Sequence, residues 1–185
     1  MVQKEGKLNM KKLSENKNLK YVIVESISLI LGILTLIFVF LPAVFEEGQP
    51  DSSIFSLMVG NDKLATSPIL IVGFVLLMLG IIVTLTALIL LLLKKSNSRI
   101  LTILSIVSMI GTLVGSAILA CAIFLSGFTE LNSALGFNQG QWGIKAGTFL
   151  VPIFGLLSTF SSFPSAVVIL HEKDLQDENA NKQNA

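Results

Sequence analysis

Four long runs of apolar residues, separated by short polar stretches, make up most of this 185-residue chain. A helix of roughly 20 residues crosses a hydrocarbon core of about 30 Å. Each run reaches that length, so we expect transmembrane helices at 21–41, 68–93, 100–127 and 146–170. Hydrophobic residues are 52% of the chain and charged residues only 14%, a balance that excludes a soluble domain of this size.

Positive charge is distributed unevenly around the four runs. Lysine and arginine gather before the first run, between the second and third, and after the fourth, whereas the other two loops hold only Lys63 and Lys145. Cytoplasmic loops retain positive charge, so we expect both termini on the cytoplasmic side of the plasma membrane. Residues 1–20 then form a Lys-rich tail, 21–170 the membrane domain and 171–185 an acidic tail, with solvated disorder expected in both tails.

Proline and polar residues mark the expected helix ends. Pro42 should end the first helix, Ser67 should cap the second, and Pro68 should be its first residue. Residues 94–99 leave room only for a tight turn, so the second and third helices should be antiparallel neighbours. The fourth run contains two prolines, which predict a bend.

Small and hydroxyl side chains recur at intervals of three and four residues in every run, which places them on one helix face. Lipid provides no hydrophobic reason for helices to associate, so close backbone approach and hydrogen bonds must hold them together. We therefore predict an all-α, antiparallel four-helix bundle with these stripes inside and the larger apolar residues facing lipid. The stripes are Glu25, Ser28, Gly32 and Thr35; Gly73, Gly80, Thr84 and Ala87; Ser105, Ser108, Thr112, Gly115, Ala122 and Ser126; and Thr148, Gly155, Ser158, Thr159, Ser162 and Ser165.

Two glycine pairs have the small-xxx-small spacing that also occurs where helices dimerise. Gly111 and Gly115 lie in the third run, and Gly143 and Gly147 lie where the fourth begins. Packing within the chain is the preferred interpretation of this spacing, and self-association is the alternative.

Glu25 is the acidic residue inside a run, about one helical turn from the expected cytoplasmic edge. It shares a stripe with small residues, so it should point into the bundle, where a charge must be paired, hydrated or neutralised. Lys94, Lys95 and Arg99 lie at the same expected depth and are the candidate partners. A structural carboxylate near the interface is the preferred interpretation, and a gating or proton-binding role is the alternative.

Other residues that could carry chemistry are scarce. Cys121 and His171 are the only cysteine and histidine, and we expect them in different halves of the membrane, so neither a metal site nor a catalytic pair is predicted. Cys121 is interpreted as a small packing residue. The chain has no phosphate-binding loop, nucleophile elbow or zinc-protease motif. We expect no enzymatic activity, no cofactor and no nucleic-acid partner.

The first outer loop becomes apolar again over residues 53–59, a stretch too short to span the membrane. It could lie on the membrane, form a strand, or cap the bundle against Leu131, Leu135 and Phe137 of the second outer loop. The cap is preferred because it buries the most apolar area. Trp142 should anchor the start of the fourth helix at the headgroup level.

Two functions fit these features. The leading hypothesis is a non-catalytic scaffold or accessory subunit whose partners are membrane lipids and either another membrane protein or a second copy of the chain. The alternative is a small transporter or channel that uses a hydroxyl-rich seam of the third and fourth helices. That seam comprises Ser108, Thr112, Gly115, Ser158, Ser162 and Pro164.

The first run ends in Phe40, Leu41 and Pro42, an outer segment covers residues 55–60, and a Gly-rich segment leads into the last run. This layout resembles small, largely uncharacterised four-helix integral membrane proteins of low-GC Gram-positive bacteria and mollicutes. The resemblance implies a bacterial membrane protein with four spans, and it implies no site residues. The arrangement of spans is also similar to that of claudins, but the claudin signature of a first-loop tryptophan and cysteine pair is absent here.

Overall fold

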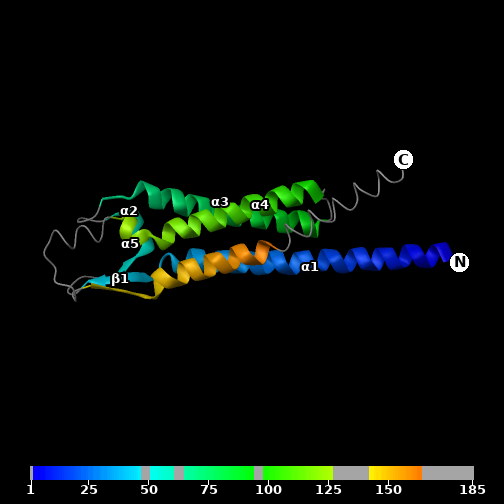
Figure 1. Ribbon diagram of the computed structural model, residues 1–185, viewed down its shortest axis with the longest axis horizontal. Helices are drawn as coiled ribbons and strands as arrows, with labels where there is room; N and C mark the ends of the chain where they lie inside the picture. Colours follow the sequence, from blue (N-terminus) through cyan, green and yellow to red (C-terminus); the bar gives the residue numbers. More distant parts are fainter. Residues whose placement is uncertain (1, 47–50, 61–64, 94–97, 127–141, 164–185) are drawn as a thin grey trace.

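The computed structural model of the protein describes five segments of the chain, residues 2–46, 51–60, 65–93, 98–126 and 142–163 (Figure 1). Within them, four helices are long and apolar enough to cross a membrane. These spans are Leu19–Phe38, Pro68–Leu92, Arg99–Ala120 and Ala146–Phe163. Each span runs opposite to the one before it and packs beside its neighbours, so the predicted four-helix membrane bundle is confirmed (Figure 1).

The first span is the later part of a longer helix, α1, which covers Val2–Phe38. Its N-terminal part extends beyond the other helices (Figure 1), whereas solvated disorder was expected for residues 1–20. Continuing an existing helix needs no new nucleation, and this segment contains no proline to stop it. The end at Phe38 lies a few residues before Pro42, as the proline predicted.

The second span is helix α3, Pro68–Leu92, which begins at Pro68 as predicted. Ser67 occupies the N-cap position, but its hydroxyl makes no capping bond. It donates instead to the carbonyl oxygen of Leu125, 3.0 Å away, and so joins the start of α3 to the segment that follows the third span.

The helix predicted at 100–127 is interrupted in the structure. Helix α4 covers Ser98–Ala120 and a short helix, α5, covers Ala122–Leu125. Cys121, with φ −88° and ψ 14°, separates the two helices and is exposed, so its interpretation as a packing residue is wrong. The break keeps Ala122 and Ile123 on the buried side and turns Cys121 outward.

The fourth span, Ala146–Phe163, begins where the sequence placed it. Its expected continuation to residue 170, with Pro164, lies outside the described residues. The bend predicted from the two prolines stays a prediction.

Glycines bring α3 and α4 into backbone contact. A Cβ atom at Gly115 would lie 2.5 Å from the Leu77 nitrogen and 2.7 Å from the Gly73 oxygen, and one at Gly111 would lie 3.1 Å from the Gly80 Cα. The pair Gly111 and Gly115 therefore faces α3 and not a second copy of the chain. The antiparallel pairing of these helices is confirmed.

The inward stripes are confirmed for the described residues, except that Thr148 is only half-buried. In α1 the buried positions recur at Glu25, Ser28, Gly32 and Thr35, and in α3 they recur every three or four residues in the same way. The outward positions carry large apolar side chains that stay exposed on the surface of the bundle. Examples are Ile30, Val72, Leu79, Ile82, Ile103, Val107, Ile153 and Phe160, each about half exposed or more.

A small antiparallel sheet, which the sequence analysis did not anticipate, lies at one end of the bundle. Strand β1, Pro42–Glu46, is central, with β2, Ser52–Ser53, on one side and β3, Trp142–Ile144, on the other. Val44 pairs with Ile144, so the sheet ties the end of the first span to the start of the fourth. An ion pair joins Lys145, at the start of the fourth span, to Asp51, the residue before β2.

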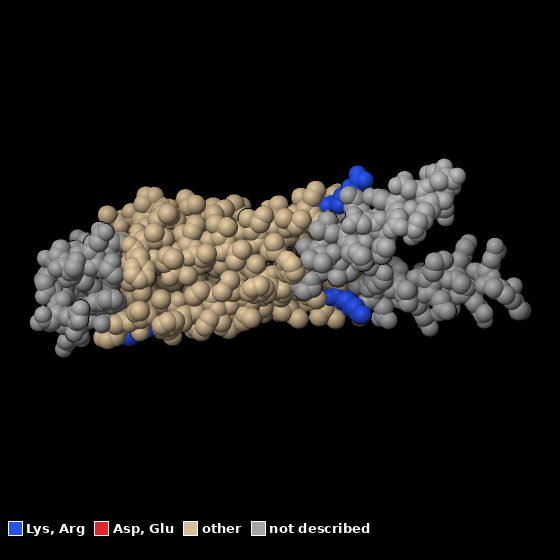
Figure 2. Space-filling model, viewed as in Figure 1, with Lys and Arg blue, Asp and Glu red and all other residues tan. Residues whose placement is uncertain are grey.

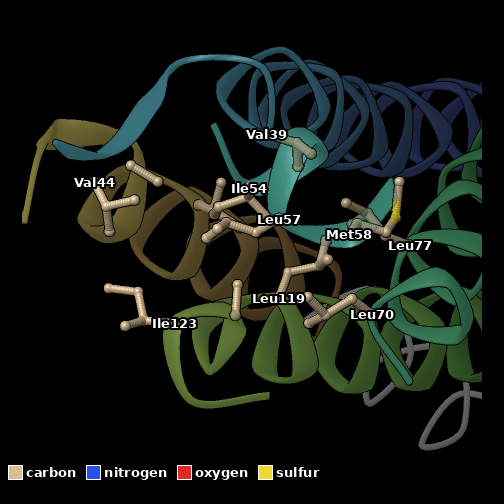
Figure 3. Packing of buried hydrophobic residues seen from close by; sticks show 12 residues of the cluster. Val39, Val44, Ile54, Leu57, Met58, Leu70, Leu77, Leu119 and Ile123 are labelled. Carbon is tan, nitrogen blue, oxygen red and sulfur yellow. The ribbon is translucent and has the colours of Figure 1, made fainter. Parts of the chain in front are cut away.

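The apolar stretch of the first outer loop forms a short helix, α2, Ile54–Val59. Its Ser53 cap accepts a hydrogen bond from the Ser56 nitrogen at 3.1 Å. Ile54, Leu57 and Met58 are buried among residues of α1, α3, α4 and α5, so this stretch caps the bundle as predicted (Figure 3). The cluster includes Val39, Leu70, Leu77, Leu119 and Ile123.

Two further predictions for this end of the bundle concern residues or side chains that the structure does not describe. The proposed second-loop contacts, Leu131, Leu135 and Phe137, fall outside the described residues. The backbone of Trp142 pairs with Glu46 in the sheet, and the headgroup role of its side chain stays a prediction.

Candidate functional site

Buried polar side chains from all four spans line the inside of the bundle, and we call them the hydroxyl column. They lie on the inward faces because their spacing of three and four residues repeats with the helical turn. Each is at most 5% exposed. The column comprises Glu25, Ser28, Thr84, Ser105, Ser108, Thr112, Ser158, Thr159 and Ser162.

Glu25 is the acidic member of the hydroxyl column and is 1% exposed. The Ser105 hydroxyl donates to Glu25 Oε1 at 3.1 Å, which links α1 to α4 across the bundle. An apolar cluster of Ala87, Leu91 and Leu101 lies between this pair and the nearer end of the bundle. Glu25 is therefore buried, and its interpretation as a structural carboxylate that reaches water or a lysine stays a prediction.

The predicted cationic partners of Glu25 are only partly described. Arg99 begins the third span and its side chain is exposed. Lys94 and Lys95 lie outside the described residues. Pairing of Glu25 with any of the three stays a prediction.

A group of three serines joins α1 to the fourth span. The Ser28 hydroxyl donates to the Ser158 carbonyl at 2.9 Å, and the Ser158 hydroxyl donates to the Ser28 carbonyl at 2.9 Å. Ser28 Oγ and Ser162 Oγ lie 2.5 Å apart. Either of these two hydroxyls can be the donor, and the Ser162 hydroxyl also reaches the Ser158 carbonyl at 3.3 Å. These hydroxyls use their protons within the bundle.

Hydroxyls also join α3 to α4 and α4 to the fourth span. Thr84 and Ser108 form a short hydrogen bond, and Ser108 also reaches the Gly80 carbonyl at 3.1 Å. Thr112 Oγ1 lies 3.2 Å from Thr159 Oγ1. Every span is therefore connected to its neighbours through this column.

The chemistry available to the hydroxyl column is limited by what surrounds its oxygens. A serine or threonine becomes a nucleophile when a base takes its proton, and the hydroxyls of the serine group donate to carbonyls or to one another. Among the described residues, no group of three or more His, Cys, Asp or Glu side chains lies together. What the column offers is hydrogen bonding between helices, with one carboxyl group at Glu25.

Most residues predicted to form a seam between the third and fourth helices contact other helices in the structure. Ser158 and Ser162 pair with α1, and Ser108 pairs with α3. Gly115 contacts the α3 backbone, and Thr112 is the seam residue that meets the fourth span as expected. Pro164 lies outside the described residues.

One contact between α4 and the fourth span was missed. Ser116 is buried and lies directly against Gly155, so closely that a Cβ atom at Gly155 would overlap its side chain. The spacing of four residues between Thr112 and Ser116 was the signal that could have identified it.

No family model, curated protein or solved structure matches this chain. The fold and the hydroxyl column define the protein as a multi-pass integral membrane protein with four candidate spans. The resemblance to bacterial four-helix membrane proteins gains no support from these comparisons and stays an expectation.

Proposed function

We propose that this protein is a non-catalytic scaffold or accessory subunit that binds another membrane protein through the outward faces of its spans and through its cap. The observation that carries this proposal is that the buried hydroxyls at membrane depth hydrogen-bond to one another and to the backbone. A solute path needs polar groups that face a water-filled space.

The packing at both ends of the bundle supports the same proposal. Ile54, Leu57 and Met58 of the cap close one end of the described interior. The cluster of Ala87, Leu91 and Leu101 fills the space between the hydroxyl column and the other end. Packing of this kind within the described residues supports a role that the surface of the bundle carries.

That surface is apolar around the spans and charged toward the ends. On the face shown in Figure 2, the described side chains between the ends are uncharged, with Lys and Arg toward either end. Lys20 and Arg99 lie at the starts of the first and third spans, at the same end of the bundle, and Lys145 lies at the opposite end, just before the fourth span. We propose that both termini are cytoplasmic in a plasma membrane, because positive charge is retained there.

The orientation is tested with reporter fusions. A reporter that is active only outside the cytoplasm should be inactive at either terminus and active when inserted after Gly60. Opposite results for the two termini would refute the arrangement of spans itself.

Site-specific photocrosslinking in intact membranes tests the partner. A crosslinking side chain at outward Val72, Val107 or Ile153 should give a discrete adduct with another protein from at least one of the three positions. The same side chain at Leu77, which is fully buried, is the matched control and should give none. Lipid adducts alone at all outward positions, together with a monomeric mass after gentle extraction, would refute the scaffold role.

The alternative function is a small transporter or channel, and Glu25 is the observation that favours it. A carboxyl group at 1% exposure within a column of hydroxyls is the kind of intramembrane group that marks ion or proton pathways. Flux into liposomes that falls in Glu25→Gln would support this function. Thr86→Val, which removes an exposed hydroxyl bonded within its own helix, is the control. Flux no greater than that of protein-free liposomes would exclude it.

A further inference from the structure

The part of α1 that precedes the first span is a helix without a described neighbour. We call residues 2–18 the basic extension, because α1 begins at Val2 and the first span begins at Leu19. The basic extension continues past the ends of α3 and α4, and none of the other helices that the structure describes runs beside it (Figure 1). The fourth span is described as far as Phe163, and residues 164–185 follow it in the sequence.

The basic extension and the sequence after the fourth span carry opposite net charge. In the extension, lysines outnumber acids, with Lys4, Lys7, Lys11, Lys12 and Lys17 against Glu5 and Glu15. In residues 172–178, acids outnumber lysines, with Glu172, Asp174, Asp177 and Glu178 against Lys173. We call residues 172–178 the acidic segment. Segments of opposite charge attract each other, and the attraction is most effective when a short tether holds them together.

A contact inside the bundle sets the reach of the acidic segment. Ser28 Oγ of α1 and Ser162 Oγ of the fourth span lie 2.5 Å apart, so both chains start from one level. From Ser28, the lysines from Lys17 to Lys4 lie about 17 to 36 Å along the helix, at 1.5 Å per residue. From Ser162, residues 172–178 can reach about 15 to 24 Å as a helix and about 33 to 53 Å when extended. The acids therefore reach the lysines in either conformation.

We propose that the basic extension of α1 is the docking surface for the acidic segment of the same chain, held by ion pairs between lysine ammonium groups and carboxylates. The tether through Ser162 gives the acidic segment a high effective concentration, which a separate anionic partner lacks. Docking covers the lysines and so controls the access of other anionic partners to them. This contact goes beyond the scaffold role and does not depend on it, because both segments belong to this chain.

The test is a distance measurement between two spin labels in the full-length protein, at Asn9→Cys and Gln176→Cys in a Cys121→Ser background. Every lysine of the extension lies within about 12 Å of position 9 along the helix, and packed segments lie about 10 Å apart. We therefore expect a population centred below about 25 Å for the docked segment. An undocked segment starts about 29 Å from position 9 and spreads about 21 Å as a coil, which gives a broad population near about 35 Å.

Two lysine variants locate the docking surface. Lys11→Gln with Lys12→Gln should lower the ratio of docked to undocked segment about fivefold, the factor that two exposed ion pairs supply. Glutamine has a helix propensity close to that of lysine, so the extension stays helical. The matched control is Lys94→Gln with Lys95→Gln, which removes another adjacent lysine pair at the same end of the bundle, between α3 and α4. It should change the ratio by less than about twofold.

Four outcomes would overturn the proposal. The first is a single broad population near the undocked distance, and the second is an equal change of the ratio in both lysine variants. The third is loss of the short distance on dilution with unlabelled protein, which would mean that the acidic segment docks on a second copy of the chain. The fourth is loss of the short distance in bilayers with anionic lipid, which would make the lipid surface the occupant of the extension.

Discussion

Replacement of Gly115 by alanine tests the contact between α3 and α4 that holds half of the bundle together. The added Cβ atom would lie 2.5 Å from the Leu77 nitrogen, 2.7 Å from the Gly73 oxygen and 2.9 Å from the Leu77 Cα. Ordinary contact begins at 3.4 Å, so the two helices must separate locally by 3.4 − 2.5, or about 0.9 Å. All three obstructing atoms belong to the backbone, so no change of side-chain rotamer relieves the overlap.

The energetic consequence follows from three contributions. Overpacking of this kind costs about 1–3 kcal/mol. Separation of the helices also weakens the hydrogen bond between Thr84 and Ser108, and such a bond between membrane helices contributes about 0.6 kcal/mol. The higher helix propensity of alanine returns up to about 1 kcal/mol. We expect Gly115→Ala to lower the free energy of unfolding by about 2 kcal/mol.

Gly32→Ala is the matched control, because the same substitution there meets only side chains. Its Cβ atom would lie 3.1 Å from Ile81 Cγ1 and 3.4 Å from the Ser158 hydroxyl, and both groups can shift. We expect the free energy of unfolding of Gly32→Ala to change by no more than about 0.5 kcal/mol. Reversible unfolding of the full-length protein in mixed micelles, driven by an increasing fraction of denaturing detergent, measures both variants. If Gly32→Ala lowered the free energy of unfolding by as much as Gly115→Ala, or by more, the packing argument would be refuted.

Three further substitutions test other contacts by the same unfolding measurement. A double-mutant cycle of Glu25→Met and Ser105→Ala should give a coupling of about 0.6 kcal/mol, and zero coupling would contradict the hydrogen bond between them. Asp51→Asn should lower the free energy of unfolding by less than about 1 kcal/mol, because both side chains of its ion pair with Lys145 are more than a third exposed. If that decrease were the same at high salt, it would not be electrostatic in origin. Leu119→Ala should cost about 2–5 kcal/mol, because Leu119 is fully buried beneath the cap; unchanged stability would mean that this cluster is not tightly packed.

The spans and their inward faces could be predicted because the bilayer leaves few alternatives. Every backbone polar group at membrane depth must be satisfied within the chain, which allows a helix and little else. Close approach then requires small residues on the contacting face. The stripe from Glu25 through Ser28 and Gly32 to Thr35 is buried for this reason, and it was recognisable from spacing alone.

The partners within the hydroxyl column could not be predicted from spacing. A stripe specifies which face of a helix is inside, but the lateral order and rotation of four helices decide which stripes meet. Ser158 and Ser162 were assigned to a seam with the third helix, yet they bond to Ser28 of α1. Gly115 was placed in the same seam, yet it lies against the backbone of α3.

The amino-acid sequence by itself determined the four candidate spans, because they follow from the length of the apolar runs. It also determined which face of each span is buried, because that follows from periods of three and four residues within single helices. Only the tertiary structure decided the break at Cys121 and the sheet that pairs Val44 with Ile144. It also decided the enclosure of Glu25 beside Ser105. These features depend on contacts between residues far apart along the chain, for which no local pattern exists.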